Sequence, residues 1–284
     1  MSFPRSDRRR GARLALKGLA GVAILAALGA VAVLGAAEWR LHAPWPAPLA
    51  PLRIQPAAAL ATEGERAFHV FGCQGCHGQA GKVLFEARGV GRLVAPNAAR
   101  RARGYSDAEL VRLIRRGVRK DGSSLIAMPA EVLAGVSDQD LAGIIAYLRQ
   151  APVLADQAGS TRWGPLGYLA LAMGKVPISA AGAPGIDPPR VRPDGRMGAY
   201  LVGTVCRHCH ELEASHDDGW GMVAPPLRVV ARSYRRSEFS RLLRTGEGLG
   251  GRQLGVMTTV ARSDLSWMTD AEIESIRAYL LDGR

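Results

Sequence analysis

Cysteine is scarce in this sequence, with 4 residues in a chain of 284. That is too few for a disulfide scaffold of this length, so the spacing of the cysteines matters more than their number. Acidic residues are also in deficit: 25 Asp and Glu stand against 37 Lys and Arg, for a formal net charge of +12. Of that surplus, +5 falls within residues 1–37, before any folded domain. This distribution argues against a nucleic-acid-binding body, whose basic residues should cluster on the folded part.

Apolar residues are not lacking. They make up 48% of the chain, and at about 100–200 residues per domain its length predicts two domains, each with a core. Disorder is therefore not expected.

An uncharged run follows the basic N-terminal flank. It extends over 20 residues from Gly18 to Ala37, and Trp39 lies just past it. At about 1.5 Å per residue this run crosses a hydrocarbon core of about 30 Å, whereas the apolar region of a cleaved signal peptide is usually only about 7–15 residues long. We expect residues 1–40 to be a basic flank and transmembrane anchor, with cleavage among the small residues at its end as the alternative. Under the positive-inside rule the flank stays inside and everything after residue 40 is exported.

Prolines are dense in residues 41–59. Such a density blocks helix formation and favours an extended polyproline II conformation, which predicts a semi-rigid stalk. The alternative is an irregular loop packed on the first domain. The prolines are Pro44, Pro46, Pro48, Pro51 and Pro56.

All four cysteines fall in two C-x-x-C-H motifs, at residues 73–77 and 206–210. This pattern is the attachment signature of c-type haem. Two thiols one helical turn apart can add to the two vinyl groups of one porphyrin, and the adjacent histidine then faces the iron. A single copy would also suit half of a zinc site or a redox dithiol. Two copies without a leftover cysteine, and without four clustered ligands or a strand–helix context, favour haem.

The spacing of other residues repeats after each motif. Ten residues separate Ala95 from Tyr105, as they separate Ala224 from Tyr234, and each tyrosine is followed twelve residues later by a glycine. Helical spacing of apolar residues predicts middle helices over residues 108–116 and 237–244. The chain therefore contains one module twice.

The final helix of each module has a start signal. Ser137 and Thr269 are predicted N-caps with acidic first turns, for helices over residues 139–148 and 271–280. Both segments end in Ala-Tyr-Leu.

With these motifs the sequence resembles the class I cytochrome c family over about residues 60–151 and 196–284. The resemblance implies an all-α fold of two tandem class I cytochrome c domains, preceded by one N-terminal transmembrane helix and separated by a connector over residues 152–195. It also implies two covalently bound c-type haems, held through Cys73, Cys76, Cys206 and Cys209.

Two further contacts follow from the resemblance. The carbonyls of Pro96 and Pro225 should accept the ring N–H of the proximal histidines, His77 and His210, which would fix each ring. A glycine of the first helix should cross the last helix beside an aromatic residue. These positions correspond to Gly64 or Gly198 with Tyr147 or Tyr279.

The sixth iron ligand must come from the opposite side of the porphyrin. Met128 is the only methionine of the first module and is expected to bind there. In the second module Met222 lies too near the proximal loop, which leaves Met257 and Met268. We favour Met257, which follows a glycine-rich loop as Met128 follows Gly122, and we expect Met268 to be a core residue. Methionine ligation raises the reduction potential and closes the iron to small ligands, which favours electron transfer.

The connector contains an apolar stretch of about ten residues, too short to span a bilayer. We expect a short helix packed between the modules; an exposed docking patch is the alternative.

Basic residues gather in the first module. They form either a solvated helix face or a patch that steers an acidic redox partner. They are Arg100, Arg101, Arg103, Arg112, Arg115, Arg116, Arg119 and Lys120.

These features predict a membrane-anchored di-haem cytochrome c on the periplasmic side of a bacterial cytoplasmic membrane, which passes single electrons between redox proteins. No residue need act as acid, base or nucleophile, so the chain would be an electron carrier and not an enzyme by itself. Its expected partners are a dehydrogenase, a quinol-oxidising complex or a terminal oxidase, with no nucleic acid. One alternative is a cytochrome subunit of a membrane-bound dehydrogenase or terminal oxidase complex. Another is a di-haem cytochrome c peroxidase, in which one iron must open a coordination position.

Overall fold

The computed structural model describes residues 5–155, 157–183, 185–217 and 222–282. The first four residues of the basic flank and Pro184 of the connector lie outside the described residues.

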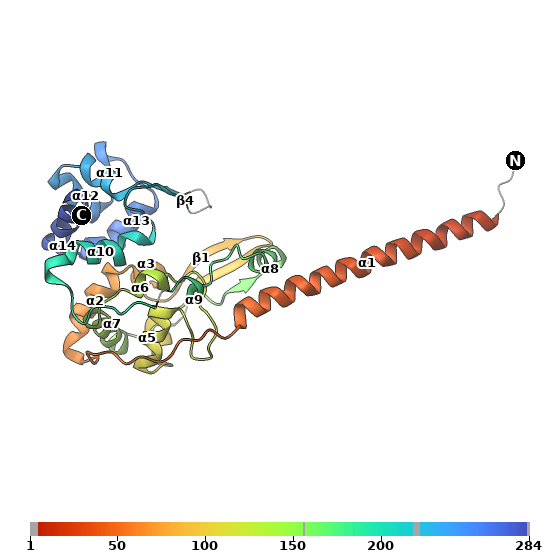
Figure 1. The fold of residues 1–284 in the computed structure, drawn as a ribbon, viewed down its shortest axis with the longest axis horizontal. Helices are drawn as coiled ribbons and strands as arrows, with labels where there is room; N and C mark the ends of the chain where they lie inside the picture. The colour runs from red at the N-terminus through yellow and green to blue at the C-terminus, as the bar shows by residue number, and fades with distance from the viewer. Residues whose placement is uncertain (1–4, 156, 184, 218–221, 283–284) are drawn as a thin grey trace.

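One long helix, α1 (Arg5–His42), extends away from a mainly helical body (Figure 1). Its segment Leu14–His42 has a mean hydropathy of 2.4 over its most apolar window, and none of that window is buried. By length and composition this helix can cross a membrane, although a signal sequence near an N-terminus has the same character.

The first module begins with a helix that leads to the first cysteine motif and ends with a helix that packs against it. Its helices are α2 (Ala61–Val70), α3 (Cys73–His77), α4 (Ala98–Ala102), α5 (Asp107–Arg116), α6 (Ala130–Leu133) and α7 (Asp138–Gln150). The predicted segments 108–116 and 139–148 fall inside α5 and α7. Ser137 caps α7 as predicted, because its side chain accepts the N–H of Asp140.

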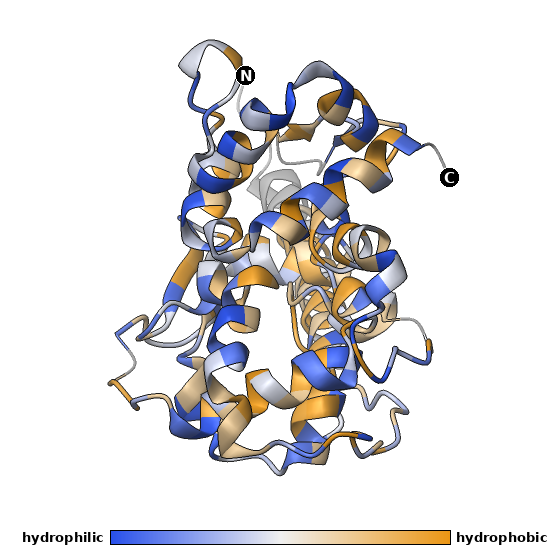
Figure 2. Ribbon diagram, turned by 90° about the vertical axis from the view of Figure 1, so that its left-hand side faces the viewer, coloured by the Kyte–Doolittle hydropathy of each residue, from blue (hydrophilic) through white to orange (hydrophobic). Residues whose placement is uncertain are grey.

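The second module repeats this order. Its helices are α10 (Met197–Thr204), the 3-10 turn η3 (Cys206–His208), α11 (Leu227–Ser233), α12 (Arg236–Thr245), η4 (Leu249–Gly251), α13 (Val256–Ser263), η5 (Leu265–Trp267) and α14 (Asp270–Asp282). The predicted segments 237–244 and 271–280 fall inside α12 and α14. Thr269 caps α14 as predicted: its hydroxyl accepts the N–H of Glu272, whose carboxylate accepts the N–H of Thr269. Figure 2 shows hydrophilic and hydrophobic residues interspersed along helices of the body.

In both modules the first and last helices cross at a glycine of the first helix, where their backbones lie close together. A Cβ at Gly64 would lie 1.8 Å from the carbonyl oxygen of Gly143 on α7, and a Cβ at Gly198 would lie 2.0 Å from the carbonyl oxygen of Ser275 on α14. The expected aromatic residues lie at these crossings. The Tyr147 ring packs 5.4 Å from that of Phe68, and the Cβ of Tyr279 would be 2.8 Å from a Cβ at Gly198.

The all-α prediction is incomplete, because two small antiparallel sheets are present. In the first, β1 (Lys82–Ala87) pairs with β2 (Gly91–Ala95) in a register that joins Ala87 to Gly91, and β3 (Arg162–Trp163) adds to the other edge of β2. In the second, β4 (His216–Asp217) pairs with β5 (Val223–Ala224). The strand pairs β1–β2 and β4–β5 each lie between a cysteine motif and its proline, whereas β3 comes from the connector.

The proline-rich segment packs along the first module, as in the alternative of a packed loop. It has no helix or strand between His42 and the short turn η1 (Ala58–Leu60). Leu52 is 5% exposed and belongs to the core, and the N–H of Trp45 donates to the carbonyl of Gly122.

The connector does not form a helix between the modules, which corrects that expectation. Its two helices are α8 (Pro165–Ala172) and α9 (Ser179–Gly182). Helix α8 packs instead beside the C-terminal end of α1, close to the first sheet (Figure 1).

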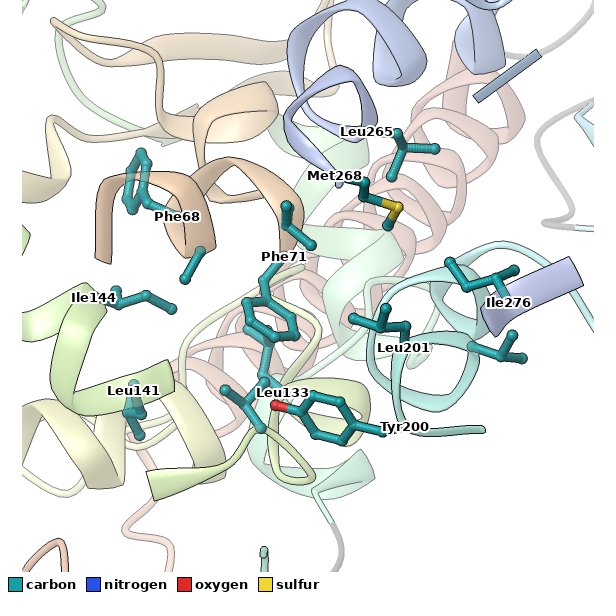
Figure 3. Packing of buried hydrophobic residues seen from close by; sticks show 14 of the residues in the cluster. Phe68, Phe71, Leu133, Leu141, Ile144, Tyr200, Leu201, Leu265, Met268 and Ile276 are labelled. Atoms are coloured by element: carbon teal, nitrogen blue, oxygen red, sulfur yellow. The ribbon is translucent and has the colours of Figure 1, made fainter. Parts of the chain in front are cut away.

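The two modules share one core. Phe71 and Leu133 of the first module lie next to Tyr200 of the second, with the Phe71 and Tyr200 rings 6.2 Å apart (Figure 3). The Tyr200 hydroxyl donates to Asp140 at 2.6 Å and accepts the N–H of Ser137 at 2.9 Å. A buried polar contact of this kind requires a defined geometry, so it fixes how the modules dock.

Ion pairs extend this junction. Arg192 of the connector contacts Asp140 of the first module at 2.6 Å and Glu272 of the second at 2.7 Å. Two residues before Asp140 in α7, the carboxylate of Asp138 pairs with Arg53 of the proline-rich segment at 2.6 Å and with Arg115 of α5 at 2.8 Å.

Stability should therefore depend on the charge of Asp138. Burial alone would raise the pKa of Asp138, but the hydrogen bonds from Arg53 and Arg115 lower it by more, so its pKa lies below its usual value. A carboxylate with a lowered pKa stabilises the fold above about pH 4, and this contribution is lost as the pH falls through the pKa of the folded chain. Asp138→Asn should lower the free energy of unfolding by about 3 kcal/mol at pH 7, because it leaves the guanidinium of Arg115, which is only 11% exposed, without its carboxylate partner. Denaturant unfolding should show the gap between wild type and variant closing as the pH falls below about 4.

The matched control is Asp187→Asn. Its side chain is 89% exposed and 3.8 Å from Arg53, so we expect a change within about 0.5 kcal/mol. A difference in free energy of unfolding between wild type and Asp138→Asn that stayed constant with pH would contradict the lowered pKa of Asp138.

Candidate functional site

The first cysteine motif occupies one short helix. α3 begins at Cys73 directly after α2 and ends at His77. Cys73 and Cys76 are half-buried on consecutive turns, and neither is in a disulfide. The two thiols and the imidazole thus lie on one rigid segment.

A single hydrogen bond orients the imidazole of His77. Its Nδ1 lies 2.7 Å from the carbonyl oxygen of Pro96, as the resemblance implies. A carbonyl only accepts, so Nδ1 carries the proton and Nε2 keeps its lone pair for a metal. Burial lowers the pKa of His77, although the bond to Pro96 opposes that effect, and the ring is neutral at pH 7.

The second motif makes the same contact on a different local backbone. Residues Cys206–His208 form a 3-10 turn, and the N–H of His210 donates to the carbonyl of Cys206 at 3.1 Å. The Nδ1 of His210 lies 2.9 Å from the carbonyl oxygen of Pro225. Each of the two histidines is therefore held by a proline carbonyl, with Nε2 available.

A zinc site would need further ligands beside the two thiols of a motif. Burial raises the pKa of Cys73 to about 12, with contributions from Cys76 and Asp264, and burial raises the pKa of Cys206 to about 12. Without a bound metal or haem these thiols are neutral at pH 7. Across the described parts of the chain, no three His, Cys, Asp or Glu side chains converge as a metal site.

Met128 lies in a loop that the connector holds in place. The Met128 side chain is half-buried at the edge of the core. The N–H of Ala127 donates to the carbonyl of Pro177 at 3.3 Å, and the N–H of Ser179 donates to the carbonyl of Leu125 at 3.0 Å. Ala127 has a φ of 59°, a left-handed conformation that costs about 1–2 kcal/mol in a residue other than glycine. Such strain directly before Met128 is typical of a functional position.

Met257 is half-buried in the first turn of α13, so the two candidate methionines have different local structures. The adjacent Thr258 fixes this turn: its hydroxyl accepts the N–H of Leu254 at 2.7 Å and donates to the carbonyl of Gly246 at 2.8 Å. Met268 is 3% exposed and packs in the shared core, as expected (Figure 3).

The connector contributes a contact that the sequence did not reveal. A Cβ at Gly246 would lie 2.3 Å from the Cα of Thr258 on α13. At the equivalent Gly117 the close neighbour is Ser179 of α9, whose Cβ would be 2.5 Å away. The glycine after the middle helix is therefore packed by a connector helix in the first module, and by a helix of the module itself in the second. The repeat marks both glycines, but nothing local in the sequence marks their partners.

The second module also covers the first cysteine motif. The carboxylate of Asp264, which is 1% exposed, accepts the N–H of Gly75 at 3.0 Å. Beside it the His69 ring stacks on Trp267 with centroids 4.0 Å apart, and its Nδ1 donates to the carbonyl of Ser263 at 2.8 Å. The two candidate sites are thus parts of one packed unit.

The predicted basic patch is divided between exposed and half-buried residues, and the half-buried members are Arg112, Arg115, Arg116 and Arg119. Arg103 donates to the carbonyl of Ala151, Arg112 donates to the carbonyl of Arg119, and Arg119 donates to the carbonyl of Ser124. Arg115 pairs with Asp138, as described above. Arg100, Arg101, Arg103 and Lys120 are the exposed members of the predicted patch. These arginines chiefly brace the helices and the Met128 loop, so the steering hypothesis rests on fewer charges.

The junction at Gly75 can be tested by a double-mutant cycle. A Cβ at Gly75 would lie 2.4 Å from a carboxylate oxygen of Asp264, so Gly75→Ala should destabilise the chain by about 1–3 kcal/mol. In the background of Asp264→Ala the clash disappears, and the cost should fall by at least about 1 kcal/mol. Denaturant unfolding measures both costs.

Gln74→Ala changes the other variable position of the same motif and serves as the control. Additive costs for Gly75→Ala and Asp264→Ala would show that the two residues do not touch.

Comparisons with known proteins agree with this geometry. Residues 59–148 match the family described as cytochrome c oxidase, cbb3-type, subunit III. The chain is 22% identical to the fructose dehydrogenase cytochrome subunit of Gluconobacter japonicus, over 66% of this chain and 43% of that protein. It is 28% identical to the alcohol dehydrogenase (quinone) cytochrome c subunit of Gluconacetobacter polyoxogenes, over 62% of this chain and 44% of that protein. It is 28% identical to the gluconate 2-dehydrogenase cytochrome c subunit of Pantoea cypripedii, over 78% of this chain and 59% of that protein.

The chain spans about half the length of these curated relatives. The motif, the histidine held by a proline carbonyl and the family match all fall within residues 59–148. That part of the chain is a cytochrome c domain similar to cbb3-type subunit III, and such a domain binds haem covalently.

Proposed function

We propose that this protein is a di-haem cytochrome c subunit that accepts electrons from a membrane-bound dehydrogenase on the periplasmic side of a bacterial cytoplasmic membrane. The first haem would be attached through Cys73 and Cys76, with His77 and Met128 on the iron. The second would be attached through Cys206 and Cys209, with His210 and Met257 on the iron.

The observation that carries the proposal is the pair of equivalent histidine contacts. His77 and His210 each donate from Nδ1 to a proline carbonyl, at 2.7 and 2.9 Å. A ligating imidazole needs such a partner to hold its tautomer and orientation. Two half-buried thiols in each motif and a half-buried methionine in each module complete a donor set that fits c-type haem.

The haem supplies one-electron chemistry, and the protein supplies orientation and environment. The proline carbonyls fix the imidazoles. The thioether of methionine, a neutral and soft ligand, would raise the reduction potential and leave no open position for small ligands. None of the residues in this set is placed to exchange a proton with a substrate, which supports electron transfer over a catalytic role.

The relatives support the dehydrogenase partner. Those reported above are named as cytochrome subunits of fructose, alcohol and gluconate dehydrogenases. Helix α1, with its arginine-rich flank inside, would anchor the chain and leave the body on the outer face.

Methionine variants test the ligand assignment. Met257→Leu should remove the contribution of one haem to the far-red absorption band of methionine-ligated ferric iron, and Met128→Leu that of the other. Met268→Leu is the matched control, because it changes a core methionine at nearly constant volume and should keep the whole band. Loss of the band in Met268→Leu, with retention in Met257→Leu, would reverse the assignment in the second module.

Gentle extraction tests the partner. In mild detergent the full chain should elute as a complex much heavier than its own 30.2 kDa, with sugar, alcohol or gluconate dehydrogenase activity in the same fractions as the haem absorbance. Elution as a single haem-containing chain without such activity would contradict a subunit role and favour a free electron shuttle.

A further inference from the structure

Helix α8 has an apolar face that protein does not cover. No charged residue occurs from Trp163 to Gly174. Leu166, Leu169 and Met173 are 56%, 41% and 62% exposed. Their spacing of three and four places them on one face, while Gly167 and Leu171 are buried on the other. A surface helix of a soluble body normally has a polar outer face, which α8 lacks.

The position of α8 identifies what covers this face. α8 packs against the C-terminal part of α1, where Ala37 is fully buried while Leu34 and Trp39 are 46% and 69% exposed (Figure 1). At the end of α8, the guanidinium of Arg40 would lie 3.6 Å from a Cβ at Gly174. The exposed leucines of α8 therefore lie at the level where α1 would leave the bilayer.

The surroundings of α8 suit a lipid headgroup region. The turn between β1 and β2 is tied to the start of α8, since the N–H of Leu166 donates to the carbonyl of Gly89 at 2.9 Å. Exposed basic side chains flank the apolar face at Arg88, Arg162 and Lys175. An apolar face with a basic rim is typical of helices that lie in the interface of a membrane with anionic lipids.

We propose that α8 lies in the headgroup boundary of the same membrane that α1 crosses, as a second contact that holds the first module against the bilayer. The proposal rests on the membrane anchor of the proposed function. Eight residues rise only about 12 Å, so α8 lies along the surface and does not span. A single span would leave the body free to tilt, whereas two contacts fix its orientation relative to a membrane-bound partner.

The test compares two variants of the full haem-loaded chain, each with one added cysteine, in liposomes of phosphatidylethanolamine and phosphatidylglycerol. Leu169→Cys places a thiol on the apolar face of α8, and Val229→Cys places one at a similarly exposed position of α11, 41% against 54%. The probe is a charged maleimide that does not enter lipid. Each labelling rate is divided by the rate of the same variant unfolded in guanidinium chloride.

We expect the normalised rate at Leu169→Cys to be at least five times slower than at Val229→Cys. A smaller difference would show that α8 faces water and would overturn the proposal. The protection should persist when the lipid is increased tenfold. Protection that disappears on dilution would mean that a second copy of the chain covers α8, which would also overturn it.

Alkaline carbonate washing distinguishes the membrane anchor α1 from the proposed membrane contact of α8. A chain that washes off the liposomes contradicts the anchor and, with it, this contact. A chain that stays in the membrane while Leu169→Cys labels rapidly contradicts the contact alone.

Discussion

The hydrogen bond from histidine Nδ1 to a proline carbonyl is the constraint around which each module is built. It spans 19 residues in the first module and 15 in the second. The intervening chain reaches the same contact through a long hairpin in one case and a two-residue ladder in the other. A backbone carbonyl cannot be moved by changing a rotamer, so the link that carries each proline, between a strand and the next helix, must dock against the motif with little freedom.

Directional polar contacts also fix how the two modules dock. Asp264 caps Gly75 inside the first motif, Tyr200 reaches the start of α7, and Arg192 joins carboxylates from both modules. These contacts are buried and directional, and breaking any of them leaves an unsatisfied polar group. The two modules are therefore not independent domains joined by a flexible linker, and their two candidate sites keep a fixed arrangement.

Local signals in the sequence predicted much of this structure. Ser137 and Thr269 cap the final helices as expected, and Met268 is a core residue. The histidine and proline contacts were implied by the family resemblance, which rests on short motifs with fixed spacing. Such features depend on residues close in the sequence or on a pattern that recurs in it.

Long-range contacts were not predictable in the same way. β3 is only two residues long and pairs with β2 about 70 positions earlier, and α9 replaces in the first module what α13 provides in the second. The proline density did not reveal that Leu52 is buried, because this burial depends on core residues far along the chain. The sequence shows the arginine cluster as a run of positive charge. It does not show that some of these arginines donate to backbone carbonyls, because any residue can supply such an acceptor.

The most direct measurement is the number of haems on the full chain matured with intact c-type haem attachment. Intact mass and the pyridine haemochrome spectrum should both give two covalent haems per polypeptide, falling to one when Cys206 and Cys209 are replaced by alanine. One haem on the wild-type chain, or none on either motif, would contradict the account.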